Sequence, residues 1–283
     1  MQEKPKDVLE LIQSTPLSEK KRQTAKYILD NSTEAAFLTA AELARRASVS
    51  EPTVIRLATD LGFSGYPELQ AALQDKLQAR LTTVHRLEGS HRYANSKSPT
   101  IQSLLSDMTN LEATLEGLNA KTVQKVLNRL QNADKVIILG YKMSACLAHY
   151  FQMALKKTID NAVAVTSATG AFQEELAYTT DHSVVVAVSF PRYTKAIVRD
   201  FRLARTKSAT TVAITDSVLS PVVEFADYYL LARCKAISYI DAFAAPLAML
   251  SAISTALSIR KENESLARLQ EMETLWEEGE IFF

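Results

Sequence analysis

The sequence predicts two domains of different fold class: an all-α domain, followed by an α/β domain whose core is a doubly wound, five-stranded parallel sheet. Up to residue 80 the apolar residues recur at helical spacing without a strand-like run. From residue 135 onward, short runs rich in valine and isoleucine alternate with helical segments, as in a parallel sheet covered by helices. With 283 residues, 47% of them hydrophobic and 23% charged, the chain can form both cores.

The pattern divides the chain into four segments. Residues 1–80 are expected to form the helical domain and residues 101–262 the sheet domain. The polar text GSHRYANSKSPT at 89–100 has no periodicity, so we expect a linker at 81–100. Residues 263–283 are expected to form an acidic helix that ends in an aromatic tail.

Within the helical domain, the segment 40–59 has the pattern of two short helices that meet at a tight turn. Leu43, Ala44 and Ala47 give the first helix a buried face of small residues, which lets a second helix approach closely. Val49 closes the expected turn, Ser50 is suited to the N-cap of the second helix, and Pro52 is suited to its first turn. Val54, Leu57 and Leu61 form the apolar stripe of this helix. Further helices are expected at 6–14, at 18–31 with Ser18 as the cap, and at 67–81.

The outward face of the second helix carries the side-chain chemistries that read base edges in a major groove. These candidate base-reading residues are Ser50, Glu51, Thr53, Ile55 and Arg56, and we expect Arg45 and Arg46 to contact phosphates. The formal net charge of zero counts against a polyanionic partner, so a helical hairpin without a role in DNA binding is the open alternative. The segment is predicted to be a DNA-binding helix-turn-helix.

Five apolar segments predict the strands of the parallel sheet. They are KVIILG at 135–140, AVAVTS at 162–167, SVVVAVS at 183–189, ATTVAIT at 209–215 and DYYLLA at 227–232. Hydroxyl side chains follow three of them: Ser144 the first, Ser189 and Thr194 the third, Thr215 and Ser217 the fourth. Ligands of such sheets sit beyond the carboxyl ends of the strands, where helix N-termini attract anions. These hydroxyls are therefore candidates for holding a phosphate.

The order of parts resembles that of the RpiR/MurR transcriptional regulators over nearly the whole chain. In the N-terminal half the stretch SEPTVIRLATDLGFSGYPEL at 50–69 carries the resemblance. The C-terminal half resembles the SIS, or sugar isomerase, domain, whose members bind phosphorylated sugars as enzymes or as regulators. In that domain a G-x-G-x-S loop follows the first strand, and GYKMS stands here at 140–144. A second loop, S-x-S-G-x-T, follows the third strand, and SFPRYT stands here at 189–194.

Both loops depart from the SIS pattern. The second glycine of the first loop is Lys142, and the second serine and the glycine of the other loop are Pro191 and Arg192. The loops thus lose two hydroxyl or backbone contacts to a ligand and gain two cations. This exchange suits a ligand with more negative charge or with a carboxylate. The expected effector-binding residues are Lys142, Ser144, Ser189, Arg192 and Thr194. A pocket that has lost its ligand is the open alternative.

These features predict a DNA-binding regulator, a repressor in preference to an activator, whose sheet domain senses an anionic sugar metabolite such as a sugar phosphate or a sugar acid. The alternative is a sugar-phosphate isomerase with a helical extension. Isomerisation needs a general base near the phosphate loops. His149 lies inside an apolar helix, His182 precedes the third strand, and Asp216 and Asp241 are expected to cap helices. We therefore expect no enzymatic activity and no catalytic residue.

We expect a homodimer or tetramer on a two-fold symmetric site in double-stranded DNA, because one recognition helix covers too few base pairs for specificity. The aromatic tail, Trp276, Phe282 and Phe283, is expected to pack on the sister subunit or back onto the sheet domain. Two cysteines are too few for a disulfide framework, and the Cys146 and His149 pair lacks a second pair for a metal. A cytoplasmic protein with no cofactor, no metal and no membrane span is expected.

Overall fold

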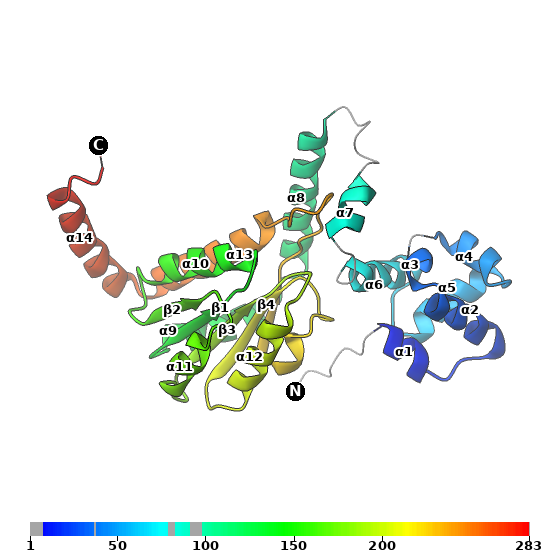
Figure 1. The fold of residues 1–283 in the computed structure, drawn as a ribbon, viewed down its shortest axis with the longest axis horizontal. Helices are drawn as coiled ribbons and strands as arrows, with labels where there is room; N and C mark the ends of the chain where they lie inside the picture. The colour runs from blue at the N-terminus through cyan, green and yellow to red at the C-terminus, as the bar shows by residue number, and fades with distance from the viewer. Residues whose placement is uncertain (1–7, 37, 79–82, 91–97, 283) are drawn as a thin grey trace. The chain divides into compact units, whose positions relative to one another are not determined.

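The computed structural model describes residues 8–36, 38–78, 83–90 and 98–282, and divides the chain into two compact units, Met1–Thr82 and Thr83–Phe283 (Figure 1). Each unit has its own hydrophobic core. One helix, α7 (Thr83–Ser90), occupies part of the segment expected to be a linker and belongs to the second unit.

The first unit is all-helical, as the sequence predicts. Its helices are α1 (Val8–Ser14), α2 (Glu19–Asp30), α3 (Ser32–Ala35), α4 (Ala40–Arg46), α5 (Glu51–Asp60) and α6 (Tyr66–Gln78). Ile28, Leu43, Leu57 and Leu69 are fully buried and come from four different helices, so the core joins distant parts of this unit. The expected start of the first helix at residue 6 and the expected end of the last at residue 81 lie outside the described residues.

The helix caps differ from the prediction in one respect. Ser18 and Ser50 occupy the N-cap positions of α2 and α5, but neither side chain accepts a capping hydrogen bond from a backbone N–H of its helix. A complete capping box is found instead at α4, where Thr39 Oγ1 accepts from Glu42 N (3.2 Å) and Glu42 Oε2 accepts from Thr39 N (2.9 Å). These backbone and side-chain bonds from Thr39 lower the pKa of the Glu42 carboxyl. The first helix of the predicted pair therefore begins at a firmly fixed residue.

The second unit contains the predicted parallel sheet. Its strands are β1 (Val136–Leu139), β2 (Ala162–Val165), β3 (Val184–Val188), β4 (Thr210–Thr215) and β5 (Tyr228–Leu231). Its helices are α7, α8 (Pro99–Glu116), α9 (Ala120–Gln131), α10 (Ser144–Leu155), α11 (Ala171–Ala177), α12 (Lys195–Arg205), α13 (Ala244–Arg260) and α14 (Glu262–Glu278), with a 3-10 turn, η2 (Val223–Phe225). All neighbouring strands pair in parallel, in the order β2-β1-β3-β4-β5.

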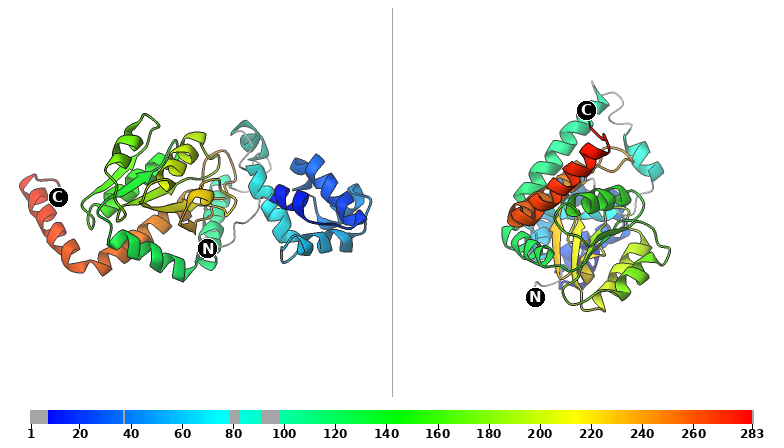
Figure 2. Two further views of the ribbon diagram at one scale, coloured as in Figure 1. Left: turned by 90° about the horizontal axis from the view of Figure 1, so that it is seen from below. Right: turned by 90° about the vertical axis from the view of Figure 1, so that its left-hand side faces the viewer.

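Helices cover both faces of this sheet (Figures 1 and 2). Phe151 of α10 and Leu250 of α13 belong to the core on one face, and Phe172 of α11 and Phe201 of α12 belong to the core on the other. The strands are buried on both sides, which explains why they read as continuous apolar runs rather than as alternating ones.

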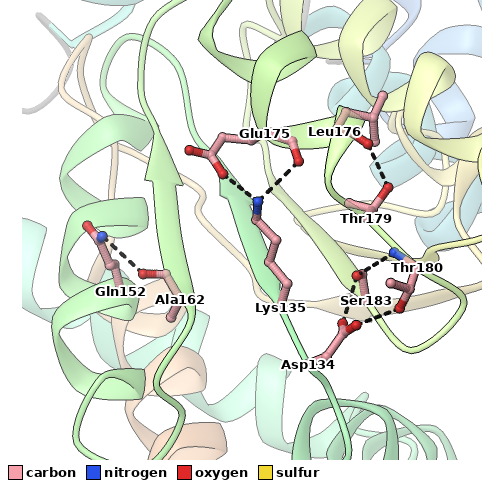
Figure 3. Close-up of polar contacts among 9 residues, drawn as sticks. All are labelled: Asp134, Lys135, Gln152, Ala162, Glu175, Leu176, Thr179, Thr180 and Ser183. Carbon is pink, nitrogen blue, oxygen red and sulfur yellow. Dashed lines mark hydrogen bonds and ion pairs between the residues drawn. The ribbon is translucent and has the colours of Figure 1, made fainter.

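The amino ends of β1 and β3 are joined by polar contacts (Figure 3). The buried ammonium of Lys135 lies 2.7 Å from Glu175 Oε2 and donates to the Glu175 carbonyl at 3.2 Å. The carboxylate of Asp134 accepts hydrogen bonds from the hydroxyls of Thr180 (2.6 Å) and Ser183 (2.8 Å). The bond from Thr180 lowers the pKa of the Asp134 carboxyl. These contacts fix the end of the sheet that is opposite the predicted ligand site.

The C-terminal helix α14 extends away from the sheet (Figure 2). Its first turns are attached to the end of α10 and the following loop through Arg268, which pairs with Asp160 and donates to the Lys156 carbonyl (3.2 Å). For Trp276 and Phe282, the described aromatic residues of the tail, the expected packing on the sheet domain is not found. Trp276 and Phe282 instead contact each other edge-on, with ring centroids 5.3 Å apart, and Phe282 stays 69% exposed. Phe283 lies outside the described residues.

Candidate functional site

The helix pair α4 and α5 has the buried face that the sequence predicts. Leu43, Ala44 and Ala47 are buried, as are Val54 and Leu57 of α5. In the turn between the helices, Ser48 has a left-handed backbone (φ 54°), and Val49 N donates to Ala44 O at 2.9 Å. The buried contacts and this turn fix the angle at which α5 leaves α4.

The outward face of α5 is accessible. Glu51, Arg56 and Ser50 are exposed, Ile55 is 42% exposed and Thr53 is half-buried. Ser50 Oγ and Thr53 Oγ1 lie 2.8 Å apart and share a hydrogen bond. The five candidate base-reading residues therefore form one surface of hydroxyl, carboxylate, apolar and guanidinium groups.

The two arginines expected to contact phosphates differ in their surroundings. Arg46 forms an ion pair with Glu34, and Glu34 also accepts a hydrogen bond from Tyr27 Oη (2.7 Å). This hydrogen bond from Tyr27 to Glu34 raises the pKa of Tyr27. Arg45 is exposed and has no ion-pair partner in the part of the chain that the structure describes. Of the two, Arg45 is thus available to a phosphate without breaking a contact.

The strand order brings the two predicted ligand loops together. β1 and β3 are neighbours, with Leu139 opposite Ala187, so the loops 140–144 and 189–194 leave the same edge side by side. β2 pairs with β1 on one side and β3 pairs with it on the other, so the strand order reverses direction between β1 and β3. This position is the topological switch point, where such sheets bind ligands. The N-termini of α10 and α12 follow these two loops.

The first loop packs tightly against α10. A Cβ atom at Gly140 would lie 2.5 Å from Ser144 O and 2.7 Å from Ala148 Cβ, so glycine is required there. Lys142 has a left-handed backbone (φ 59°) and an exposed side chain. A lysine therefore holds, with strain, the backbone conformation that glycine adopts freely.

Each loop contains one buried serine. Ser144 begins α10 and is 7% exposed, and Ser189, after β3, is 3% exposed. Neither Oγ atom has a hydrogen-bond partner within the described residues. Thr194 is the N-cap of α12, where its Oγ1 accepts from Ile197 N at 3.3 Å. The first turns of α10 and α12 contain no acidic residue, so the positive ends of both helix dipoles are not neutralised.

The two cations that distinguish these loops are both exposed. Lys142 and Arg192 form no ion pair within the described part of the chain. Unpaired cations, unpaired hydroxyls and two helix N-termini at one sheet edge are the components of an anion site. The structure thus assembles all five predicted effector-binding residues on two adjacent loops.

Sequence reasoning missed a tyrosine–aspartate pair in each loop. Tyr141 Oη donates to Asp200 Oδ2, and Tyr193 Oη donates to Asp216 Oδ1, both at 2.7 Å. Burial and the neighbouring carboxylates raise the pKa of both tyrosines, so both stay neutral donors. One signal was available: Asp200 is a charged residue on the otherwise apolar face of α12 beside Phe201.

The residues considered for acid–base catalysis are dispersed. His149 is exposed on α10, and His182 is exposed before β3, at the sheet edge opposite the loops. Asp216 and Asp241 were expected to cap helices, but Asp216 accepts from Tyr193 and Asp241 pairs with Arg86 at 3.1 Å. None of the described helices is long and apolar enough to cross a bilayer.

The fold and these two surfaces define a class: a DNA-binding transcriptional regulator with a helix-turn-helix domain and a separate α/β domain. Two family models match, the helix-turn-helix domain of the rpiR family at residues 6–80 and the SIS domain at residues 129–256. The chain belongs to the RpiR family of transcriptional regulators. The predicted family and fold class are confirmed.

Relatives and a solved structure agree with this assignment. An uncharacterised helix-turn-helix regulator of Haemophilus influenzae is 28% identical, with 78% of this chain and 76% of that protein covered. The regulator HexR of Escherichia coli is also 28% identical, over 75% of this chain and 73% of HexR. The structure of the Vibrio vulnificus NanR protein complexed with ManNAc-6P has the same fold, with a TM-score of 0.60, 22% identity, and 95% and 97% of the two chains covered.

Proposed function

We propose that this regulator binds a two-fold symmetric operator through α5 and that an anionic sugar-derived ligand, bound at the loops 140–144 and 189–194, changes its affinity for DNA. The observation that carries the ligand proposal is a pair of buried serines whose hydroxyls have no hydrogen-bond partner within the described residues: Ser144 at the start of α10 and Ser189 directly after β3. A phosphoryl or carboxylate group would satisfy both hydroxyls and the helix dipoles. The NanR protein, which has this fold, is complexed with a phosphorylated sugar.

Each ligand residue has a distinct role in the proposal. Ser144 and Ser189 donate hydrogen bonds to the anion from the side of the sheet, at the carboxyl ends of the strands. Lys142 and Arg192, which are exposed, approach it from the solvent side. Thr194 fixes the start of α12, so that the first backbone N–H groups of this helix face the ligand. The added cations favour a ligand with two negative groups or a dianionic phosphate over a neutral sugar.

On the DNA side, the candidate base-reading residues are Ser50, Glu51, Thr53, Ile55 and Arg56, and Arg45 and Arg46 are the candidate phosphate contacts. A homodimer would place two α5 helices in successive major grooves of a symmetric site. We propose repression as the mode of action, with the ligand shifting the balance between DNA-bound and free protein through a coupling of about 1–3 kcal/mol.

The experiment is a thermal-shift screen of phosphorylated sugars and sugar acids, with the matching neutral sugars as controls. A ligand well above its dissociation constant raises the melting temperature of the wild type. Arg192→Ala should reduce this shift much more than Ser217→Ala, because Ser217 Oγ already accepts from Leu219 N (3.2 Å). If no anionic sugar stabilises the wild type, or if Arg192→Ala responds as the wild type does, the ligand proposal is wrong.

The screen also tests the isomerase alternative. We propose that the protein does not turn over the sugar, because His182 lies before β3, at the opposite end of the sheet from the loops, and Asp216 accepts a hydrogen bond from Tyr193. Any stabilising sugar phosphate should be recovered unchanged after prolonged incubation with the protein. Conversion to the ketose or aldose isomer would overturn the regulator-only proposal.

A further inference from the structure

Helix α8 turns its polar side toward the rest of its unit. Ser106, Asn110 and Thr114 recur every four residues and so share one side of the helix. Ser106 Oγ (2.9 Å) and Asn110 Nδ2 (3.0 Å) donate to Lys235 O, and Asn110 Oδ1 accepts from Lys235 N (3.0 Å). Thr114 Oγ1 accepts from Arg233 N at 2.8 Å. These four bonds attach α8 to the segment that follows β5.

The opposite side of α8 is apolar and exposed. Its large side chains recur at spacings of three and four and are between 39% and 73% exposed: Ile101, Leu104, Leu105, Met108, Leu111 and Leu115. We call this set the α8 apolar face. A surface helix of a monomer normally has the reverse orientation, with its apolar stripe toward the core. α8 cannot rotate to bury this face without breaking the four bonds on its polar side.

We propose that the α8 apolar face is a self-association surface, at which α8 of one copy of this chain packs against α8 of a second copy. The inference gives the homodimer of the proposed function its contact surface and rests on that proposal. Spacings of three and four over about four turns are typical of a helix that pairs with another helix along its length.

The size of the face fits a dimer. α8 is 18 residues long, which corresponds to about 27 Å of helix. Burying six side chains of this size on each of two copies would remove on the order of 1,000 Å² of apolar surface from water. That total approaches the lower end of the range of stable specific interfaces, which is about 1,200 Å². The share of one copy, about 500 Å², is near the upper end of the exposed apolar patches of monomers, and patches of that size are often functional.

Charge limits where the closest contact can lie. Glu112 lies on the same side of α8 as the apolar residues, in its C-terminal half, and is exposed. Two copies would therefore avoid burying this carboxylate and meet most closely around Leu104 and Met108. Met108 is the midpoint between Ile101 and Leu115, so it lies near the two-fold axis whether the two helices run parallel or antiparallel.

The first experiment is analytical ultracentrifugation of the full chain. Leu104→Glu combined with Met108→Glu should raise the dimer dissociation constant at least about 30-fold, the effect of losing a hot spot. The matched control is Leu203→Glu, an exposed leucine of α12 on the other face of the sheet, which should leave the dissociation constant unchanged. Melting temperatures of all variants report whether each chain is folded.

The second experiment does not depend on a destabilising charge. In a background with Cys146→Ser and Cys234→Ser, Met108→Cys should form an intermolecular disulfide on mild oxidation, because residues at the axis face their own copies. Leu203→Cys should not. A dimer that resists the double glutamate substitution and does not crosslink through position 108 would overturn the α8 surface while leaving the homodimer proposal intact. A wild type that sediments as a monomer would overturn both.

Discussion

Lys142 has a left-handed backbone, and its side chain is one of the two exposed cations at the candidate effector site. Lys142→Gly should separate these two properties. Relief of about 1–2 kcal/mol of strain, offset by about 0.5–1 kcal/mol for the greater freedom of glycine in the unfolded chain, should leave a small gain in stability. The same variant should bind a stabilising anionic sugar more weakly.

Urea denaturation and titration calorimetry measure these two effects. Lys142→Ala is the matched control, because it removes the charge and keeps the strained backbone, so it should lose ligand affinity without gaining stability. Equal ligand affinity in the wild type and both variants would show that Lys142 points only to solvent.

Arg56 is exposed on the outward face of α5 and has no ion pair within the described residues. Arg56→Ala should weaken binding to the specific operator by about 1–3 kcal/mol and relax the base preference at one position per half-site. Competition binding against a library of operator variants measures both effects. An equal loss of affinity for specific and for random DNA would show that Arg56 contacts the DNA phosphate backbone and does not read a base.

Arg45 and Arg46 should contact DNA phosphates, so alanine at either position should weaken binding to all DNA sequences. It should also reduce the slope of the logarithm of the binding constant against the logarithm of the salt concentration by about 1. The effect of Arg46→Ala is expected to be the smaller, because Arg46 must leave Glu34 before it reaches DNA. Binding measured at several salt concentrations tests this order. A larger effect of Arg46→Ala would mean that its pair with Glu34 positions it for DNA.

At the scale of the element, α14 is attached at its start and free at its end. Ser265, near the start of α14, is buried, and the contacts of Arg268 lie in the second turn, whereas Leu275 and Phe282 are largely exposed. Removal of residues 273–283 should therefore shift the melting temperature of a single folded chain by less than about 2 °C. Removal of residues 262–283 should lower it clearly, because the contacts of Arg268 are lost. If the shorter truncation also dissociates subunits in sedimentation, the aromatic tail belongs to the dimer interface.

At the scale of the whole molecule, each unit has its own core, and the division falls between Thr82 and Thr83. A chain of residues 83–283 should therefore fold alone, lose DNA binding, and keep both the α8 apolar face and the ligand loops. We expect this fragment to sediment as a dimer and to respond to the same anionic sugars as the full chain. A folded fragment that is monomeric would locate the dimer contacts in the first 82 residues.

The candidate sites were predictable to different degrees. The two loops were found because their hydroxyls follow apolar strands directly in the sequence, and the α5 surface was found because its outward residues have helical spacing. The tyrosine–aspartate pairs were not, since Tyr141 and Asp200 are 59 residues apart and Tyr193 and Asp216 are 23 apart. Nothing local marks such partners, because they meet only when the strands pair.

The sequence by itself determined the five strands and most of the helices, though not α7 in the expected linker. Helical and strand periodicity, glycine positions and strand-end hydroxyls are properties of short segments. The sequence also determined the family through the motifs in those segments. Only the tertiary structure decided that β1 and β3 are neighbours, which joins the two ligand loops. It likewise decided that α8 turns its polar side inward, because the partners of Ser106, Asn110 and Thr114 are contributed by a segment more than one hundred residues away. Both outcomes depend on long-range pairing, which the spacing of residues within one element does not encode.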